Sequence, residues 1–149
     1  MAQEVDLENS VGYALKQASS ALRGAMDTAL DPLGLTVSQY SCLELLGQRP
    51  GLSGSELARG VFVTRQSMQT LLQGLQDRGL VERPESAPHG RALPAGLTRR
   101  GAAVLAEASR AVAAVETRMV QALPDRDRRR LLADLRTCVT ALAGPVEGD

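Results

Sequence analysis

Three helix-start signals follow one another within about 30 residues, and they constrain the fold of this chain more than any other feature. In "LTVSQY", Thr36 is a candidate N-cap with Gln39 three residues later, and Ser53 and Glu56 in "LSGSEL" have the same spacing. Thr64, at the end of "VFVT", is a third candidate N-cap. Helices that restart so soon are necessarily short, so this segment is expected to hold three short helices joined by tight turns.

The last of these helices has two chemically different faces. Apolar residues at i, i+3, i+4 and i+7 predict its buried side, and these are Met68, Leu71, Leu72 and Leu75. The opposite side is rich in groups that can donate and accept hydrogen bonds, namely Arg65, Gln66, Gln69, Gln73 and Gln76. This helix is therefore a candidate for presenting a polar surface to a partner.

Longer amphipathic stretches flank the short helices on both sides. Between residues 7 and 30, apolar residues recur every three to four positions, which predicts one long helix with an apolar stripe. After the short helices, Thr98 is the expected N-cap of a second long helix, Pro124 interrupts it, and Asp125 is the expected N-cap of the last helix. The last apolar face comprises Leu131, Leu132, Leu135, Val139 and Leu142.

A β-hairpin is expected between the short helices and the second long helix. Gly79 is a candidate helix stop, and "LVERP" and "RALPAGL" read as two extended segments around a tip rich in Pro, Ser and Gly. Pro94 lacks an N–H group, so the second strand should be short or irregular. The expected order is α-α-α-α-β-β-α-α, a mainly α fold with a small β-hairpin.

Composition narrows the function classes. The chain of 149 residues is about one domain long, so 1–149 is expected to be a single domain. No apolar run approaches the roughly 18 residues of a membrane span, and the N-terminus lacks a secretory signal, so we expect a cytoplasmic protein without a membrane partner. Cys42, Cys138 and the single His89 lack metal-ligand spacing, which argues against a metal or other cofactor. No nucleophile–base pair or phosphate-binding loop is visible, which argues against an enzyme.

The zero net charge hides a basic middle. Residues 49–100 contain eight arginines and four acidic residues, a local net charge of +4, and the rest of the chain has −4. Such asymmetry indicates a face that meets an anion, and nucleic acid is the most common large one. The basic run "RDRRR" at 126–130 mixes with two aspartates, and we interpret it as a solvated helix face rather than a DNA contact.

These features together describe a winged helix-turn-helix. An α-helix fits the major groove of DNA, where Gln and Arg pair with base edges, while Ser and Thr hydroxyls and helix N-termini bind phosphates. We therefore predict double-stranded DNA as the partner. The expected DNA-binding residues are Ser53, Ser55, Thr64, Arg65, Gln66, Ser67, Gln69, Thr70, Gln73, His89 and Arg91.

The region from Leu35 to Gly101 resembles the MarR family of winged-helix transcriptional regulators. The matching pieces are "SELA", "VTRQSMQTLLQGLQDRGLVER" and "LTRRG", in this order. The resemblance implies a homodimer held by residues 7–30 and 104–142, with a DNA-binding region at 36–100. It also implies a repressor that places two recognition helices on a palindromic operator, with half-sites about 34 Å apart.

The segment "PESAPHGRALP" at 84–94 was open to three interpretations: a linker, a histidine site or a wing. A metal or catalytic role for His89 would need partners, and the chain has no second histidine. Wings of the family usually carry Asp-x-Arg at the tip, and the matching residues here are His89, Gly90 and Arg91. The resemblance thus implies that Arg91 enters the minor groove without the usual carboxylate to orient it.

The resemblance also implies a small, often aromatic, effector bound between the dimer helices and the winged region. Tyr13, Gln17 and Tyr40 are the candidate ligand residues, although both tyrosines are equally consistent with packing. Two alternatives for the whole protein remain: a winged-helix module that binds proteins rather than DNA, and a regulator that senses oxidants through Cys42 or Cys138.

Overall fold

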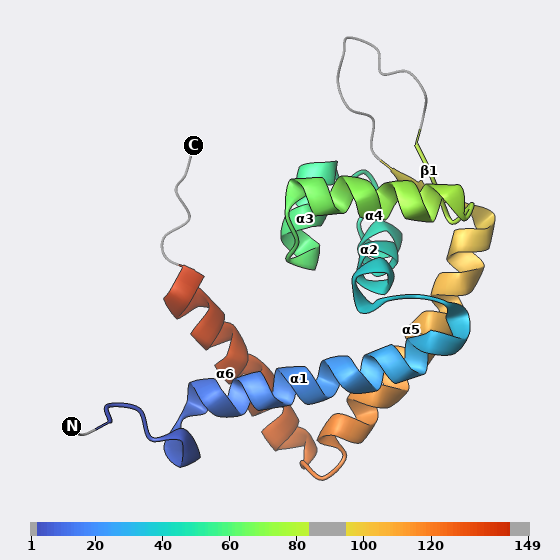
Figure 1. Ribbon diagram of the computed structural model, residues 1–149. Helices are drawn as coiled ribbons and strands as arrows, with labels where there is room; N and C mark the ends of the chain where they lie inside the picture. Colours follow the sequence, from blue (N-terminus) through green and yellow to red (C-terminus); the bar gives the residue numbers. More distant parts are fainter. Residues whose placement is uncertain (1–2, 84–94, 144–149) are drawn as a thin grey trace. The chain divides into compact units, whose positions relative to one another are not determined.

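The computed structural model describes residues 3–83 and 95–143 and is mainly helical (Figure 1). The chain divides into two compact units, Met1–Val115 and Glu116–Asp149. The helices are α1 Val11–Leu30, α2 Val37–Gln48, α3 Gly54–Val61, α4 Arg65–Asp77, α5 Arg99–Val120 and α6 Asp125–Ala143. Two short 3-10 helices occupy Leu7–Asn9 and Asp31–Leu33, and the strands are β1 Val81–Glu82 and β2 Gly96–Leu97. No helix of the described ranges is long and apolar enough to cross a membrane.

The three short helices begin where the sequence predicts. Thr36 and Gln39 form a reciprocal capping box on α2, with the Gln39 amide nitrogen 3.1 Å from the Thr36 hydroxyl. Ser53 and Glu56 form the same box on α3. Because these contacts join residues only three positions apart, the sequence pattern was sufficient to predict them.

The first long helix starts later than its apolar spacing predicts. Residues Leu7–Asn9 form a 3-10 turn, and α1 begins at Val11. The Ser10 hydroxyl accepts a hydrogen bond from the Tyr13 amide at 3.1 Å and so caps α1 at this point. The polar cap therefore overrides the apolar periodicity that continues upstream.

The core of the first unit lies between α2, α3, α4, β1 and the first half of α5. The predicted buried face of α4 is confirmed, since Met68, Leu72 and Leu75 are completely buried and Leu71 is partly buried. The largest fully buried side chains of the unit are Leu30, Leu43, Leu57, Met68, Leu72, Leu75, Leu80 and Val81.

The two β-strands and Thr98 connect the start of α5 to the end of α4. β1 and β2 pair antiparallel, with Val81 opposite Leu97, which confirms the expected hairpin. Thr98 bridges the two ends: its hydroxyl donates to the Gly79 carbonyl at 2.6 Å and accepts from the Gly101 amide at 2.9 Å. Gly101 packs so closely on Leu80, the residue before β1, that a Cβ there would collide with the Leu80 carbonyl oxygen. This close packing explains the glycine in "LTRRG".

The second unit contains the end of α5, a turn and α6. Asp125 is the first residue of α6 rather than its N-cap, because the Pro124 carbonyl accepts the Arg128 amide at 3.0 Å and so occupies the cap position. The Arg128 guanidinium donates to the carbonyl of Val120, the last residue of α5, and to that of Leu123 in the turn that follows. Part of "RDRRR" thus has a structural role, since Arg128 ties α6 to the turn between the two helices.

Candidate nucleic-acid interface

The exposed face of α4 brings together most of the predicted DNA-binding residues. Met68 points into the core, and the side chains on the other faces of the helix lie in solvent. The exposed residues are Arg65, Gln66, Ser67, Gln69, Thr70 and Gln73. Because the opposite face packs into the core through Met68, Leu72 and Leu75, this polar face is held on a rigid frame.

The N-terminus of α4 is capped by hydroxyl groups. Thr64 accepts a hydrogen bond from the Ser67 amide at 3.0 Å, and its own hydroxyl donates to the Ser67 hydroxyl at 2.9 Å. Arg65 is the first residue of α4 and follows the N-cap Thr64 directly. A helix N-terminus carries a partial positive charge, so this end of α4 is chemically suited to a phosphate group.

Further along α4, the side chain of Gln73 is engaged within its own helix. Its amide nitrogen donates to the Asp77 carboxylate at 2.8 Å, four residues later. A shallow hollow of about 540 Å³ follows this stretch, lined by Gln69, Thr70, Gln73, Gly74 and Asp77. Asp77, which is not among the predicted DNA-binding residues, thus engages one donor of the Gln73 amide.

The two predicted serines on α3 have different environments. Ser53 is the N-cap, and its hydroxyl accepts the Glu56 amide at 3.2 Å, so its cap role is already filled. Ser55 lies in the first turn and is half-buried. The hydrogen bonds from Ser53 hold the pKa of the Glu56 carboxyl below its usual range, which favours the ionised form of Glu56 in the capping box.

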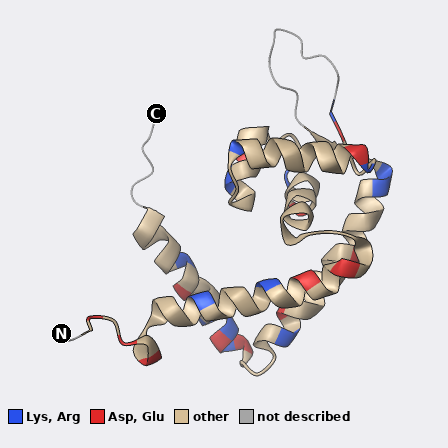
Figure 2. Ribbon diagram, viewed as in Figure 1, with Lys and Arg blue, Asp and Glu red and all other residues tan. Residues whose placement is uncertain are grey.

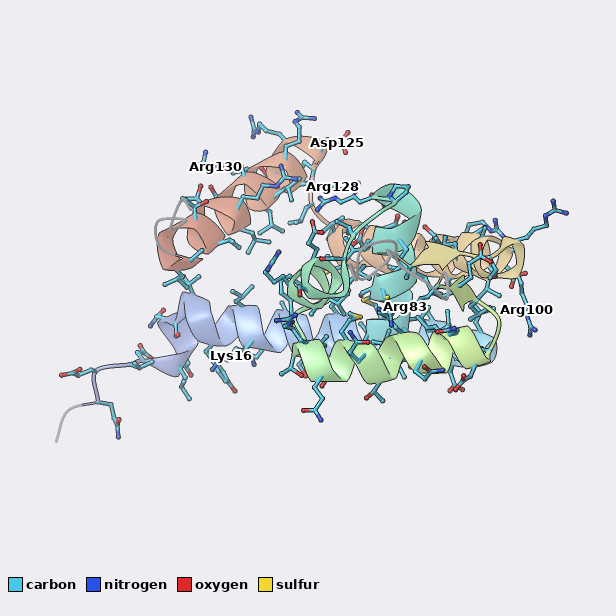
Figure 3. All side chains as sticks on the ribbon, turned by 90° about the horizontal axis from the view of Figure 1, so that it is seen from above. Lys16, Arg83, Arg100, Asp125, Arg128 and Arg130 are labelled. Atoms are coloured by element: carbon cyan, nitrogen blue, oxygen red, sulfur yellow. The ribbon has the colours of Figure 1, made fainter. Side chains whose placement is uncertain are left out.

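Arg83 is a residue of this surface that the sequence analysis did not select. It follows β1 directly, and its guanidinium donates to the carbonyl oxygen of the Gln69 side chain at 3.1 Å. Figure 3 shows Arg83 alongside the ribbon of α4. Gly54, the first residue of α3, lies next to this pair. The only signal in the sequence was a basic residue at the end of a strand, which many exposed strands carry.

A second arginine ties α4 to the segment after α1. The guanidinium of Arg78, the C-cap of α4, donates to the carbonyl of Gly34 at 2.8 Å and to that of Leu33 at 3.3 Å. Lysine and arginine mark α3 and the start of α5 in Figure 2, with acidic residues near the end of α4. His89 and Arg91, predicted at the wing tip, lie outside the described residues.

A separate hollow of about 470 Å³ opens between α1, α2 and the turn that joins α3 to α4. Its lining combines hydroxyls, one guanidinium and apolar groups: Ser19, Leu22, Arg23, Met26, Val37, Ser38, Ser41, Val61, Phe62 and Val63. Phe62 is 93% exposed and has a φ of 65°, the only positive φ of a non-glycine residue within the described ranges. An exposed ring on such a backbone is unfavourable for stability alone, which makes this turn a functional candidate.

The predicted ligand residues do not line this hollow. Tyr13 and Gln17 are exposed on α1, and Tyr40 is buried, with its hydroxyl donating to the Glu44 carboxylate at 2.8 Å. The structure therefore does not bring the three together at the hollow, and it points instead to side chains that the sequence analysis did not select. No spacing in the sequence indicates that the turn at 61–63 faces α1.

The two cysteines differ in accessibility. Cys42 is completely buried on α2, and desolvation raises the pKa of its thiol to about 12. Cys138 is exposed on α6. Since the thiolate is the reactive form, burial argues against an oxidant-sensing role for Cys42. In the part of the chain that the structure describes, no three metal-ligating side chains come together.

Comparisons with known proteins agree with this architecture. Residues 33–92 match the model of the MarR family. The chain is 44% identical over 128 residues to the HTH-type transcriptional repressor Rv2887 of Mycobacterium tuberculosis, covering 84% of this chain and 92% of that protein.

Solved structures of relatives include complexes with DNA and with small molecules. The DNA complex of Rv2887 has a TM-score of 0.73 at 39% identity and covers 88% of this chain and 98% of that one. The repressor CouR of Rhodococcus jostii RHA1, bound to a 23-mer duplex, has a TM-score of 0.83 at 32% identity and covers 94% and 99%.

Rv2887 has also been solved with salicylic acid, with a TM-score of 0.71 at 42% identity, covering 87% of this chain and 96% of that one. The structure and the similarities point to the same family: α4 has a buried and a polar face, and the two strands of the wing are paired. This chain belongs to the MarR family of DNA-binding transcriptional regulators.

Proposed function

We propose that this protein is a homodimeric repressor that binds a palindromic operator and is released from it by a small aromatic acid. The observation that carries the proposal is the exposed polar face of α4, opposite an apolar face that packs into the core. We also propose that the protein works in the cytoplasm, because a regulator of a chromosomal operator acts there. The DNA contacts we propose are those on α4 and α3, together with His89 and Arg91 of the wing.

The homodimer is supported by apolar side chains of α1 and α6 that are exposed to solvent. No residue of α6, which the structure describes in full, is buried, although its leucines and valines recur at helical spacing. Leu135, Val139 and Leu142 are 37%, 67% and 89% exposed, and Val11 on α1 is 77% exposed. Because a soluble monomer seldom exposes such apolar helix faces, we propose that a second copy covers them.

The effector is supported by the chemistry of the hollow beside Phe62. The Arg23 guanidinium can pair with a carboxylate, the hydroxyls of Ser38 and Ser41 can hydrogen-bond to it, and the exposed Phe62 ring can stack on an aromatic ring. The lining of the hollow also includes Phe62 and Val63 of the turn that leads into α4, so a ligand there would contact the segment just before the recognition helix. The salicylic acid complex of Rv2887 supports the same class of ligand.

Operator binding is tested by fluorescence anisotropy with a labelled duplex from the promoter of the protein's own gene. We expect it to bind about 10³-fold more tightly than random DNA of equal length at the same salt concentration. Equal affinity for the two duplexes would contradict the proposal and would favour a winged-helix module that binds proteins.

Effector release is tested by adding salicylate to the operator complex, with uncharged salicylamide as the matched compound. We expect salicylate alone to lower operator affinity, and Arg23→Met to lose this response. Lys16→Met removes a cation from the same helix outside the hollow and should keep the response. Equal responses of the two variants would exclude Arg23 as the carboxylate partner.

A further inference from the structure

The hydrogen bond between Arg83 and Gln69 has a consequence for base recognition. Gln69 lies on the exposed face of α4, and its carbonyl oxygen is 3.1 Å from a guanidinium nitrogen of Arg83. The two residues are 14 positions apart and come from different elements, so the contact depends on the packing of β1 beside α4.

The chemistry of arginine determines which end of the Gln69 amide faces it. A guanidinium has only donors, so the carbonyl oxygen must turn toward Arg83 and the NH₂ group away from it. On the other side, the amide nitrogen lies 3.4 Å from the position that a Cβ would take at Gly54. The amide is therefore confined between the end of β1 and the start of α3, and it cannot turn over without losing its partner.

This orientation matters because a free glutamine reads adenine with both ends of its amide. The carbonyl oxygen accepts from adenine N6 and the NH₂ group donates to N7. Guanine instead presents two acceptors, N7 and O6, in the major groove. A glutamine whose oxygen is already engaged retains its donors for a base.

We propose that Arg83 is a positioning residue that turns Gln69 into a hydrogen-bond donor and so sets a preference for guanine over adenine at one base pair of each half-site. The proposal rests on the proposed operator binding. Arg83 acts through Gln69, and its contribution is therefore a change of base preference in addition to any uniform change of affinity.

The test is selection of bound duplexes from a random pool by the full-length protein and its variants, followed by sequencing. Gln69→Ala identifies the position concerned as the one that loses its base preference. At that position we expect guanine for the unmodified protein, and a shift of about tenfold toward adenine for Arg83→Met, which lies within the discrimination of about 5- to 150-fold that one good bidentate contact provides.

Two further variants keep the test decisive if Arg83→Met folds poorly. Arg83→Lys retains a donor for the Gln69 oxygen and should retain guanine. Gln69→Glu keeps the contact with Arg83 but removes the NH₂ donors, so it should shift the preference about tenfold toward cytosine, whose N4 donates. Arg110→Met, which removes an exposed arginine of α5, is the matched control and should leave every position unchanged.

The outcomes separate this inference from the proposed function. Enrichment of no sequence by the unmodified protein would overturn operator binding itself. Enrichment of an operator with an unchanged base preference in Gln69→Ala, or a shift of Arg83→Met toward any base other than adenine, would overturn the role of Arg83 alone.

Discussion

Helices α4 and α6 have similar apolar periodicity and opposite surroundings. On α4, Met68, Leu72 and Leu75 are completely buried within the first unit. On α6, Leu135 is 37% exposed and Leu142 is 89% exposed, and no residue of that helix is buried. Both stripes have the spacing that predicts a helix packed on a partner, and only the stripe of α4 is buried.

This difference separates two kinds of stability. The frame of α4 is maintained by contacts within one chain, so it should not depend on protein concentration. Most helical stability in proteins comes from packing of an apolar face rather than from helix propensity, and α6 has no buried residue. The stability of α6 should therefore depend on association, and the following predictions, from the largest effect to the smallest, test this distinction.

The largest effect is expected in the buried frame of α4. Leu72→Ala should lower the free energy of unfolding by about 4 kcal/mol, because it removes a fully buried side chain and leaves a cavity. Chemical denaturation measures this, with Leu132→Ala on α6 as the matched control, since that side chain is 51% exposed. Equal losses at high dilution would show that α6 packs as tightly as α4 in a single chain.

A second effect concerns two glycines with different surroundings. Gly101→Ala should destabilise the protein by about 3 kcal/mol, because the new Cβ would meet the Leu80 carbonyl and α5 would have to shift. Gly74→Ala on α4 has open space around it and should stabilise the fold by up to about 1 kcal/mol through helix propensity. Thermal unfolding distinguishes the two, and a destabilised Gly74→Ala would mean that the surface of α4 is less open than the structure indicates.

The third effect tests the apolar face of α6 directly. Leu135→Asp should raise the dimer dissociation constant by about 30-fold, corresponding to about 2 kcal/mol for burying an unpaired polar group at an interface. Sedimentation velocity at several concentrations measures the change. Arg136→Asp, an exposed neighbour that already carries charge, is the control. A monomer in the unmodified protein, or a dimer unaffected by Leu135→Asp, would contradict association through this face.

The smallest effect concerns the cysteines and involves no change in stability. Because desolvation raises the pKa of Cys42 to about 12, four units above pH 8, about one thiol in 10⁴ is ionised at that pH. Iodoacetamide should therefore label Cys138 much faster than Cys42, and the rate at Cys42 should rise about tenfold per pH unit above pH 8. Mass spectrometry of peptides measures both rates; equal rates at pH 8 would show that α2 opens readily.

The structure shows which parts of the site could be predicted from sequence. The caps at Thr36, Ser53 and Thr64 join residues three positions apart, and the buried face of α4 follows from the period of one helix. Arg83 and Gln69 meet only because β1 returns beside α4, and Arg78 reaches Gly34 across 44 residues. Neither pair has a local pattern, so both were missed.

The residues that line the hollow could not be predicted from the sequence for the same reason. Tyr40 is a polar aromatic residue on a predicted helix, but it lies buried in the core, where its hydroxyl donates to the Glu44 carboxylate. Phe62 and Arg23 come together because the turn after α3 faces α1, and that depends on how three helices pack.

By itself, the sequence determined where most helices begin and which side of α4 turns inward, because capping and helical periodicity act over a few residues. It also indicated the MarR family, because the order of several motifs survives in the chain. Only the tertiary structure decided which arginine holds Gln69, which residues line the hollow and which apolar stripe stays uncovered. Those contacts join residues far apart in sequence, and their geometry exists only once the core has packed.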